Sequence, residues 1–162
     1  MHDAAPRRCP RDVAGLKQDF PIFGREVNGK RLVYLDSASS SQKPQAVLDA
    51  MDDCYRNYYA NIHRGVYAIA EQATAAFEEA RRKVARFVNA RRVEELVFTR
   101  NATEAINLVA YTWARANVRE GDAIVLSHME HHSNVVPWHM LAAERGVELR
   151  WIPLTDDFHL DL

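Results

Sequence analysis

The sequence has few of the features that mark several classes of protein. It holds two cysteines, Cys9 and Cys54, in 162 residues, and two cysteines so far apart make neither a disulfide framework nor a zinc knuckle. No apolar run reaches the length that crosses a bilayer, and residues 1–12 lack the apolar centre of a secretory signal. The 21 basic and 22 acidic residues nearly cancel, so no electrostatic footprint for nucleic acid exists. These absences favour a cytoplasmic protein with neither membrane nor nucleic-acid partners.

What is present is the composition of a globular protein. Hydrophobic residues make up 48% of the chain and charged residues 27%, and the length suffices for one modest domain with a core. Residues 1–11 offer little to bury and are expected to be disordered, whereas residues 12–18 favour a short helix. The turn signal Asn28-Gly29 marks the end of this leader. We therefore divide the chain into a leader with a short helix, residues 1–28, and a main domain, residues 29–162.

Apolar spacing predicts the elements that follow the turn. Residues 31–35 favour a strand, and the small residues of 36–41 then form a loop that either lets the backbone approach a ligand or only connects two elements. Residues 44–60 favour a helix in which Cys54 is a small buried hydrophobe. Residues 67–88 favour a longer helix. Its expected apolar face comprises Ala73, Phe77, Ala80, Val84 and Phe87.

From residue 95 onward, short apolar runs alternate with helical patterns. The expected strands are 95–98, 123–127 and 147–153, and the expected helices are 103–117 and 135–145. The last helix has Pro137 near its start and Gly146 at its end. This β-α-β-α-β order predicts an α/β fold with a parallel sheet and right-handed crossovers. Because parallel strands end at one edge, the loops 100–103 and 128–134 should open on the same side, where such sheets bind ligands.

A candidate anion site lies where the strand expected at 95–98 turns into a helix. The start of a helix leaves backbone N–H groups unpaired, and these donors and the helix dipole together favour a phosphate. The same residues also fit a plainer role, because Asn101 and Glu104 have the spacing of a capping box. Both interpretations remain open from this stretch alone.

Three histidines and a glutamate follow the strand expected at 123–127, namely His128, Glu130, His131 and His132. Imidazole and carboxylate can ligate zinc or iron, but this spacing matches no common metal motif, so no metal is assigned. In a second interpretation, one ring stacks on a flat heteroaromatic ligand whose phosphate lies at the helix start. In a third, the histidines only pair with backbone and solvent.

Six short motifs then occur in one order along the chain, from about Asp12 to Leu162. Together they resemble the N-terminal part of a SUF-type (group II) cysteine desulfurase, which belongs to the class V aminotransferases of pyridoxal-phosphate (PLP) fold type I. The resemblance implies that residues 29–162 are the first part of a PLP-binding domain, with its first parallel strands and an incomplete sheet. The motifs are Asp19-Phe20-Pro21, Leu35-Asp36-Ser37-Ala38-Ser39, Asn61-Ile62-His63-Arg64-Gly65, Arg100-Asn101-Ala102-Thr103-Glu104-Ala105-Ile106-Asn107, Met129-Glu130-His131-His132-Ser133-Asn134 and Val136-Pro137-Trp138.

The resemblance also implies a reaction and its partners. Enzymes of this kind take sulfur from L-cysteine, release L-alanine and leave a persulfide on an enzyme cysteine. PLP serves as the electron sink, the enzyme is a homodimer, and the sulfur passes to an acceptor protein of iron–sulfur cluster assembly.

Position by position, the resemblance assigns roles to a few residues. Ala102 and Thr103 match the pair that binds the PLP phosphate. His131 matches the histidine that stacks on the pyridine ring and is available for proton transfer, which makes it the catalytic candidate. The candidates near the substrate are Ala38, His63 and Arg64.

Two kinds of departure from the family pattern stand out. Ala102 replaces the usual threonine, which removes one hydroxyl from the phosphate site, and Ser39 replaces the more usual alanine. The family's Schiff-base lysine, pyridine-binding aspartate, carboxylate-binding arginine and persulfide cysteine would follow residue 162. We therefore expect a fragment that is inactive alone, and the alternative is a non-catalytic binding or assembly module.

Overall fold

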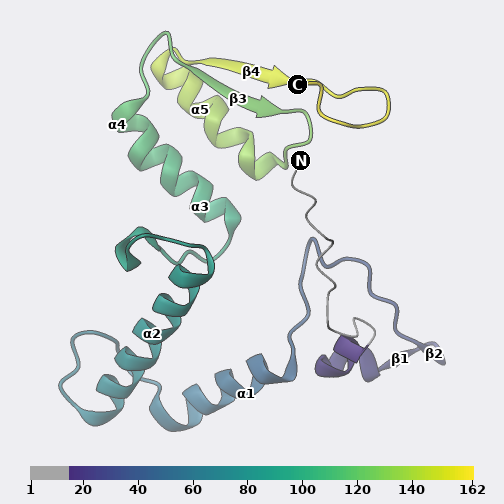
Figure 1. Ribbon diagram of the computed structural model, residues 1–162, viewed down its shortest axis with the longest axis vertical. Coiled ribbons are helices and arrows are strands. Elements are labelled where there is room, and N and C mark those ends of the chain that lie inside the picture. The colour runs from purple at the N-terminus through teal and green to yellow at the C-terminus, as the bar shows by residue number, and fades with distance from the viewer. Residues whose placement is uncertain (1–14) are drawn as a thin grey trace, which may run out of the picture. The chain divides into compact units, whose positions relative to one another are not determined.

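A computed structural model describes residues 15–162, as the ribbon in Figure 1 shows. The chain divides into two compact units at Val93 and Glu94, and each unit is described by itself. The expected disorder of residues 1–11 and the environment of Cys9 lie outside the described part. No helix within residues 15–162 is both long and apolar enough to cross a membrane.

The described part of the first unit begins with two short turns and a hairpin. The 3-10 turns η1 (Gly15–Asp19) and η2 (Pro21–Gly24) precede the strands β1 (Glu26–Val27) and β2 (Lys30–Arg31), which pair antiparallel. Asn28 and Gly29 have φ values of 54° and 70°, the left-handed backbone that a two-residue hairpin turn requires. The predicted turn is therefore confirmed.

The strand predicted over residues 31–35 is wrong beyond Arg31. Its partner β1 has only two residues, so the ladder ends after the backbone N–H of Leu32 donates to the carbonyl of Arg25 at 3.1 Å. Residues 32–36 belong to no strand, and the side chain of Leu35 is 91% exposed. An apolar run becomes a strand only where a second strand can take its backbone hydrogen bonds.

The two helices predicted for the first unit are both present. The first is α1 (Gln45–Asp53), which continues into a π-helical turn η3 (Cys54–Tyr58), and the second is α2 (Ala68–Phe87). Pro44 is the N-cap of α1, with φ −68° and ψ 156°. Cys54 is only half-buried, so its expected full burial is wrong.

The apolar face predicted for α2 is only partly buried. Of the five predicted residues, Ala73 is buried and Phe77 is half-buried, whereas Ala80, Val84 and Phe87 are exposed. The other buried residues of α2, Ala70 and Ala85, were not predicted. The predicted face is therefore wrong in its second half, because the spacing of apolar residues does not say how far neighbouring elements extend along the helix.

The second unit contains a two-stranded parallel sheet and two helical segments. The first segment is nearly continuous, from α3 (Ala102–Val109) through a π-helical turn η5 (Ala110–Ala114) to α4 (Arg115–Asn117). The strand β3 (Ala123–Ser127), the 3-10 turn η6 (His132–Asn134), the helix α5 (Val136–Arg145) and the strand β4 (Glu148–Ile152) follow. β3 and β4 pair in parallel from Ala123 with Glu148 to Ser127 with Ile152.

The strand predicted over residues 95–98 is wrong. A 3-10 turn η4 (Val93–Glu95) is followed by irregular backbone, and the parallel sheet consists of β3 and β4 alone within the described residues. The observed order in this unit is therefore α-β-α-β. The helices predicted over 103–117 and 135–145 and the strands predicted over 123–127 and 147–153 are confirmed.

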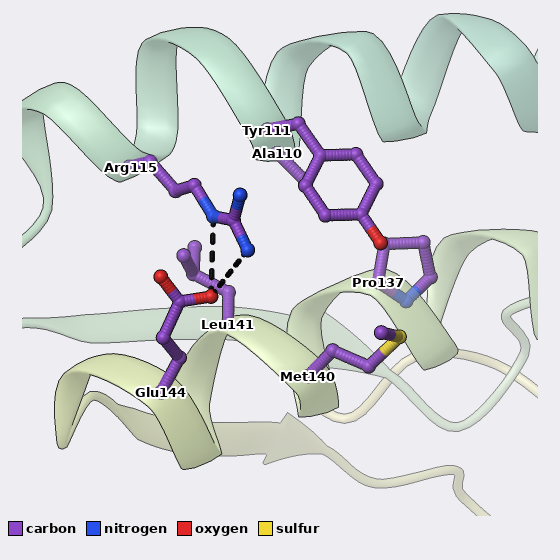
Figure 2. Close-up of a pocket in the computed structure, with 7 residues that line it drawn as sticks. All are labelled: Ala110, Tyr111, Arg115, Pro137, Met140, Leu141 and Glu144. Atoms are coloured by element: carbon purple, nitrogen blue, oxygen red, sulfur yellow. Dashed lines mark hydrogen bonds and ion pairs between the residues drawn. The ribbon is translucent and has the colours of Figure 1, made fainter.

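The core of the second unit lies between its helices and its sheet. Leu141 of α5 is 3% exposed and Leu126 of β3 is 5% exposed, and they are buried together with Ala110 and Ala114 of η5. Figure 2 shows that Arg115 and Glu144 join the same two helical segments at the surface, where their side chains form an ion pair of 2.5 Å. The seven residues drawn there leave a cavity of about 10 Å³, room for about one water molecule and too small for a cofactor.

Candidate functional site

The start of α3 is closed by two reciprocal hydrogen bonds. Oδ1 of Asn101 accepts from the backbone N–H of Glu104 at 2.9 Å, and Oε2 of Glu104 accepts from the backbone N–H of Arg100 at 2.6 Å. The arrangement resembles a capping box, except that Glu104 accepts from the backbone N–H of the residue before the N-cap and not from that of the N-cap itself. The Arg100 guanidinium, 3.1 Å from Oε1 of Glu104, helps to hold the pKa of that carboxyl below its ordinary value.

This cap leaves two backbone N–H groups at the helix start available to a bound anion. The N–H of Glu104 is taken by Asn101 Oδ1, and the N–H of Ala105 by the Asn101 carbonyl at 3.1 Å. No acceptor within residues 15–162 pairs with the N–H groups of Ala102 and Thr103, and both residues are exposed. The capping role and the anion-binding role are thus compatible, because they use different N–H groups.

The loop that carries His131 is held by a chain of side-chain hydrogen bonds. Ser127, buried at the end of β3, donates its hydroxyl to Oε1 of Glu130 at 2.7 Å. Asn134 donates its amide to Oε2 of Glu130 at 2.8 Å, and the indole N–H of Trp138 donates to Oδ1 of Asn134 at 2.9 Å. The amide of Asn134 and the hydroxyl of Ser127 hold the pKa of Glu130 below its ordinary value. This chain links the strand end to the first turn of α5.

His131 itself is exposed, and the backbone of its own loop contacts its ring. Nδ1 accepts from the backbone N–H of Ser133 at 3.2 Å and lies 3.0 Å from the Ser133 hydroxyl. The ring of His132 meets it edge-on, with centroids 6.0 Å apart. His131 therefore acts as the N-cap of η6 and keeps Nε2 outside these contacts.

The helix start and the His131 loop lie on the same side of the sheet. The helix α3 packs against η6, the turn that follows His131. Figure 1 shows that α3 and α5 both begin on the side where β3 and β4 end. The strand ends of an open α/β sheet are where its ligands bind, so Thr103 and His131 belong to one region of the second unit.

His132 lies against His131, but His128 and Glu130 contact other groups. The ring of His128 packs against Trp151, with centroids 5.6 Å apart, and both oxygens of Glu130 are occupied by hydrogen bonds. Across residues 15–162, no three His, Cys, Asp or Glu side chains gather in a way that could hold a metal ion. The structure therefore does not support the metal-site interpretation of this cluster.

The candidate substrate residues belong to the first unit, and each is described within it. Ala38 sits in a turn in which the backbone N–H groups of Ser39 and Ser40 donate to the Asp36 carbonyl at 3.1 and 3.0 Å. The hydroxyl of Tyr34 donates to the Ser40 carbonyl at 2.5 Å and closes the loop. The small residues thus form an ordered turn in which Ala38 is exposed.

His63 is held by the middle of α2. Its φ of 70° lies in the left-handed region, which is unusual for a residue with a side chain. Its backbone N–H donates to Oγ1 of Thr74 at 2.9 Å, and its Nε2 lies 2.9 Å from Oε1 of Glu78. The ring of Phe77 meets the imidazole edge-on at 5.7 Å. Arg64 is exposed beside it.

Two sets of contacts were not predicted from the sequence: the hydrogen bonds of Glu130 that hold the His131 loop, and the contacts of Thr74 and Glu78 that hold His63. Serine three positions before glutamate, as in Ser127 and Glu130, is a spacing that could have indicated a local hydrogen bond. The contact between His63 and Glu78 spans 15 positions, and no local pattern indicates it.

Comparison with known proteins shows which family the chain resembles. Residues 33–162 match the aminotransferase class-V family. A probable cysteine desulfurase of Synechocystis is 52% identical over 155 residues, and a cysteine desulfurase of Escherichia coli is 54% identical over 150 residues. These alignments cover 96% and 93% of the chain, but the chain spans only 37% of the length of either relative.

Solved structures give the same result. The apo cysteine desulfurase of Thermococcus onnurineus NA1 superposes with a TM-score of 0.82 at 38% identity, over 93% of this chain and 36% of that one. A cysteine desulfurase of Escherichia coli superposes with a TM-score of 0.69 at 39% identity, over 88% of this chain and 35% of that one. Because the family match covers most of its residues, the chain belongs to the aminotransferase class-V family, and its fold is that of the N-terminal part of these enzymes.

Proposed function

We propose that this chain is the N-terminal portion of a PLP-dependent cysteine desulfurase, which converts L-cysteine to L-alanine and retains the sulfur as an enzyme persulfide. The observation that carries the proposal is the placement of the α3 start and the His131 loop on one side of the sheet. The similarity to relatives named as cysteine desulfurases supports the same conclusion. The motif pattern favours the SUF-type group within that class.

The start of α3 fits the phosphate of PLP. The N–H groups of Ala102 and Thr103 point out of an already capped helix, and the helix dipole adds favourable potential for an anion. The Thr103 hydroxyl supplies a further donor, whereas Ala102 supplies only its backbone. His131 would then cover the pyridine ring from the neighbouring loop. PLP supplies an electron sink when it is bound, and the chain would bind its phosphate and orient its ring.

The remaining roles follow the family pattern. Ala38, His63 and Arg64 are proposed to approach L-cysteine in a homodimer. The Thr74 and Glu78 contacts that hold His63 would keep its imidazole in one place for that purpose. The sulfur acceptor is proposed to be a protein of iron–sulfur cluster assembly, and the location to be the cytoplasm. The division into a leader, residues 1–28, and a PLP-binding domain from residue 29 also stands as a proposal.

A phosphate-bearing probe tests the cofactor site without any chemistry. The probe is 4-deoxypyridoxine 5′-phosphate, which has the ring and phosphate of PLP but no aldehyde to react with lysines. In an NMR titration we expect shifts at the amides of Ala102 and Thr103 and at the ring of His131. The same ring without phosphate should bind much more weakly.

Two threonine variants provide the matched comparison. Thr103→Val removes a hydroxyl at the proposed phosphate site and should weaken probe binding. Thr112→Val removes a hydroxyl later in the same helical segment, where it donates to the Leu108 carbonyl at 2.5 Å, and should leave probe affinity unchanged. Shifts confined to other surfaces, or equal effects of both variants, would contradict the proposed site.

The enzymatic part of the proposal is tested in the gene and in an assay. We expect the reading frame beyond codon 162 to encode a Ser-x-His-Lys motif and a later cysteine. The 162-residue chain with PLP should release neither sulfide nor alanine from L-cysteine and show no absorbance of a lysine-bound cofactor. Release of either product would show that the chain is not a fragment of this kind. A stop codon at position 163, with stable protein in cells, would instead favour a binding or assembly module.

A further inference from the structure

The loop between β3 and α5 is held by several side-chain hydrogen bonds within itself and to the elements on either side. Glu130 uses both carboxylate oxygens, one for the Ser127 hydroxyl and one for the Asn134 amide, at 2.7 and 2.8 Å. The backbone N–H of Met129 also donates to the Ser127 hydroxyl at 3.3 Å. The indole of Trp138 extends the chain of bonds into α5. The backbone on both sides of His131 is thereby fixed.

That fixed backbone determines what Nδ1 of His131 can do. The donor 3.2 Å from Nδ1 is the backbone N–H of Ser133, and a backbone amide nitrogen donates and never accepts. Nδ1 must therefore offer a lone pair at this position. A neutral imidazole carries one N–H and one lone pair on its two nitrogens, so its proton must be on Nε2.

We propose that Glu130 is a positioning residue for His131, and that the loop it fixes holds neutral His131 as the Nε2–H tautomer. Nε2 hydrogen-bonds to no group in the described part of the chain, so this N–H is available to a bound molecule. The significance for catalysis rests on the proposed function, because it makes the outer edge of the ring a hydrogen-bond donor toward substrate or cofactor. The tautomer itself follows from the loop alone.

The tautomer can be measured directly on the 162-residue chain without any cofactor. Long-range ¹H–¹⁵N correlation NMR of ¹⁵N-labelled protein at neutral pH distinguishes a protonated ring nitrogen from one with a lone pair. His131→Asn identifies the signals of His131 among the seven histidines. We expect a protonated Nε2 and an unprotonated Nδ1. A protonated Nδ1 would overturn the proposal whether or not the chain binds PLP, and failure to bind the probe would leave the tautomer result standing.

Variants separate the positioning role of Glu130 from a general effect of charge. Glu130→Ala removes both acceptors and should give a mixture of tautomers. Glu130→Gln should restore the Nε2–H form, because an amide can accept from Asn134 and donate to Ser127. Glu148→Ala removes an exposed carboxylate that pairs with Arg150 at 2.8 Å on β4, and should leave His131 unchanged.

A Ser133 variant tests whether the backbone N–H or the hydroxyl of this residue sets the tautomer of His131. Ser133→Ala keeps the backbone N–H and should keep the Nε2–H form, whereas a switch to Nδ1–H would assign the effect to the hydroxyl and overturn the argument from the backbone. An unchanged single tautomer in a folded Glu130→Ala would remove Glu130 from the proposal. The measurement on the unmodified chain depends on no variant of Glu130 or Ser133, so the tautomer assignment is tested even where those variants fail to fold.

Discussion

The hydroxyl of Ser127 and the carboxylate of Glu130 are 2.7 Å apart, and this contact joins the end of β3 to the loop of His131. With the Asn134 amide, it holds the pKa of Glu130 below its ordinary value, which is about 4.3 in a free chain. The unfolded chain therefore binds this proton at a higher pH than the folded chain does. The stability from Glu130 is complete above about pH 4.3 and is lost as the pH falls through the lower, folded pKa.

A local signal can follow this titration. The indole N–H of Trp138 donates to Asn134, which in turn donates to Glu130. We expect the Trp138 indole resonance to move only below the ordinary glutamate range in the unmodified chain and to lose that step in Glu130→Gln. Glu148→Gln, in which another carboxylate of lowered pKa is neutralised, should leave the step in place. A Trp138 step that persists in Glu130→Gln would contradict the assignment.

The cap of α3 should contribute measurably to stability. Asn101→Ala removes the acceptor for the Glu104 N–H and should lower the free energy of unfolding by about 0.5–2 kcal/mol. Asn101→Asp, which retains an acceptor, should restore most of the loss. Asn117→Ala is the control, because this exposed amide only donates to the Trp113 carbonyl at 2.7 Å. Denaturant unfolding monitors all three, and an equal loss in the control would argue against a specific cap.

The elements that sequence reasoning predicted well carry their signals within themselves. The helix α5 has Pro137 near its start, and Gly146 follows its end with a φ of 66°, so residue type alone marks both boundaries. The cap formed by Asn101 and Glu104 likewise depends on two residues three positions apart. Local spacing was sufficient in both cases.

The elements that were predicted wrongly depend on distant neighbours. Residues 95–98 have the composition of a buried strand, but the sheet of β3 and β4 does not extend to them. The support for His63, whose backbone is left-handed, comes from Thr74 and Glu78. Composition cannot reveal either relationship, because each is decided by a segment elsewhere in the chain.

Gly65 should be indispensable for the loop of His63. A Cβ at this position would collide with the Cβ of Ala70, which is fully buried in α2, and come within 3.1 Å of the Tyr67 ring. Gly65→Ala should therefore lower the free energy of unfolding by about 1–3 kcal/mol. Gly24→Ala is the matched control, because a Cβ there would meet nothing within 4 Å. Equal stability of the two variants in denaturant unfolding would show that the loop can move away from α2.

Apolar packing, rather than the ion pair in Figure 2, should hold α5 to the preceding helical segment. Leu141 is 3% exposed, so Leu141→Ala should cost about 2–5 kcal/mol in unfolding free energy. The side chains of Arg115 and Glu144 are 40% and 42% exposed, and solvent screens such a pair to about 0–1 kcal/mol. Glu144→Gln should therefore have a much smaller effect in the same denaturant experiment, and a larger loss than that of Leu141→Ala would reverse this conclusion.

The alanine at the start of α3 should weaken the proposed phosphate site. Ala102 is exposed beside Thr103, and Ala102→Thr would add a hydroxyl that can donate to the anion. A hydrogen bond to a charged group is worth about 1.5–3 kcal/mol, so the Kd for 4-deoxypyridoxine 5′-phosphate should fall at least about tenfold. Ala116→Thr, at an exposed position of α4, controls for the lower helix propensity of threonine and should leave the Kd unchanged. The gain should also disappear with the probe that lacks phosphate, because the added hydroxyl then has no anion to bind. Unchanged or weaker binding by Ala102→Thr would place the phosphate somewhere other than the N–H groups at this helix start.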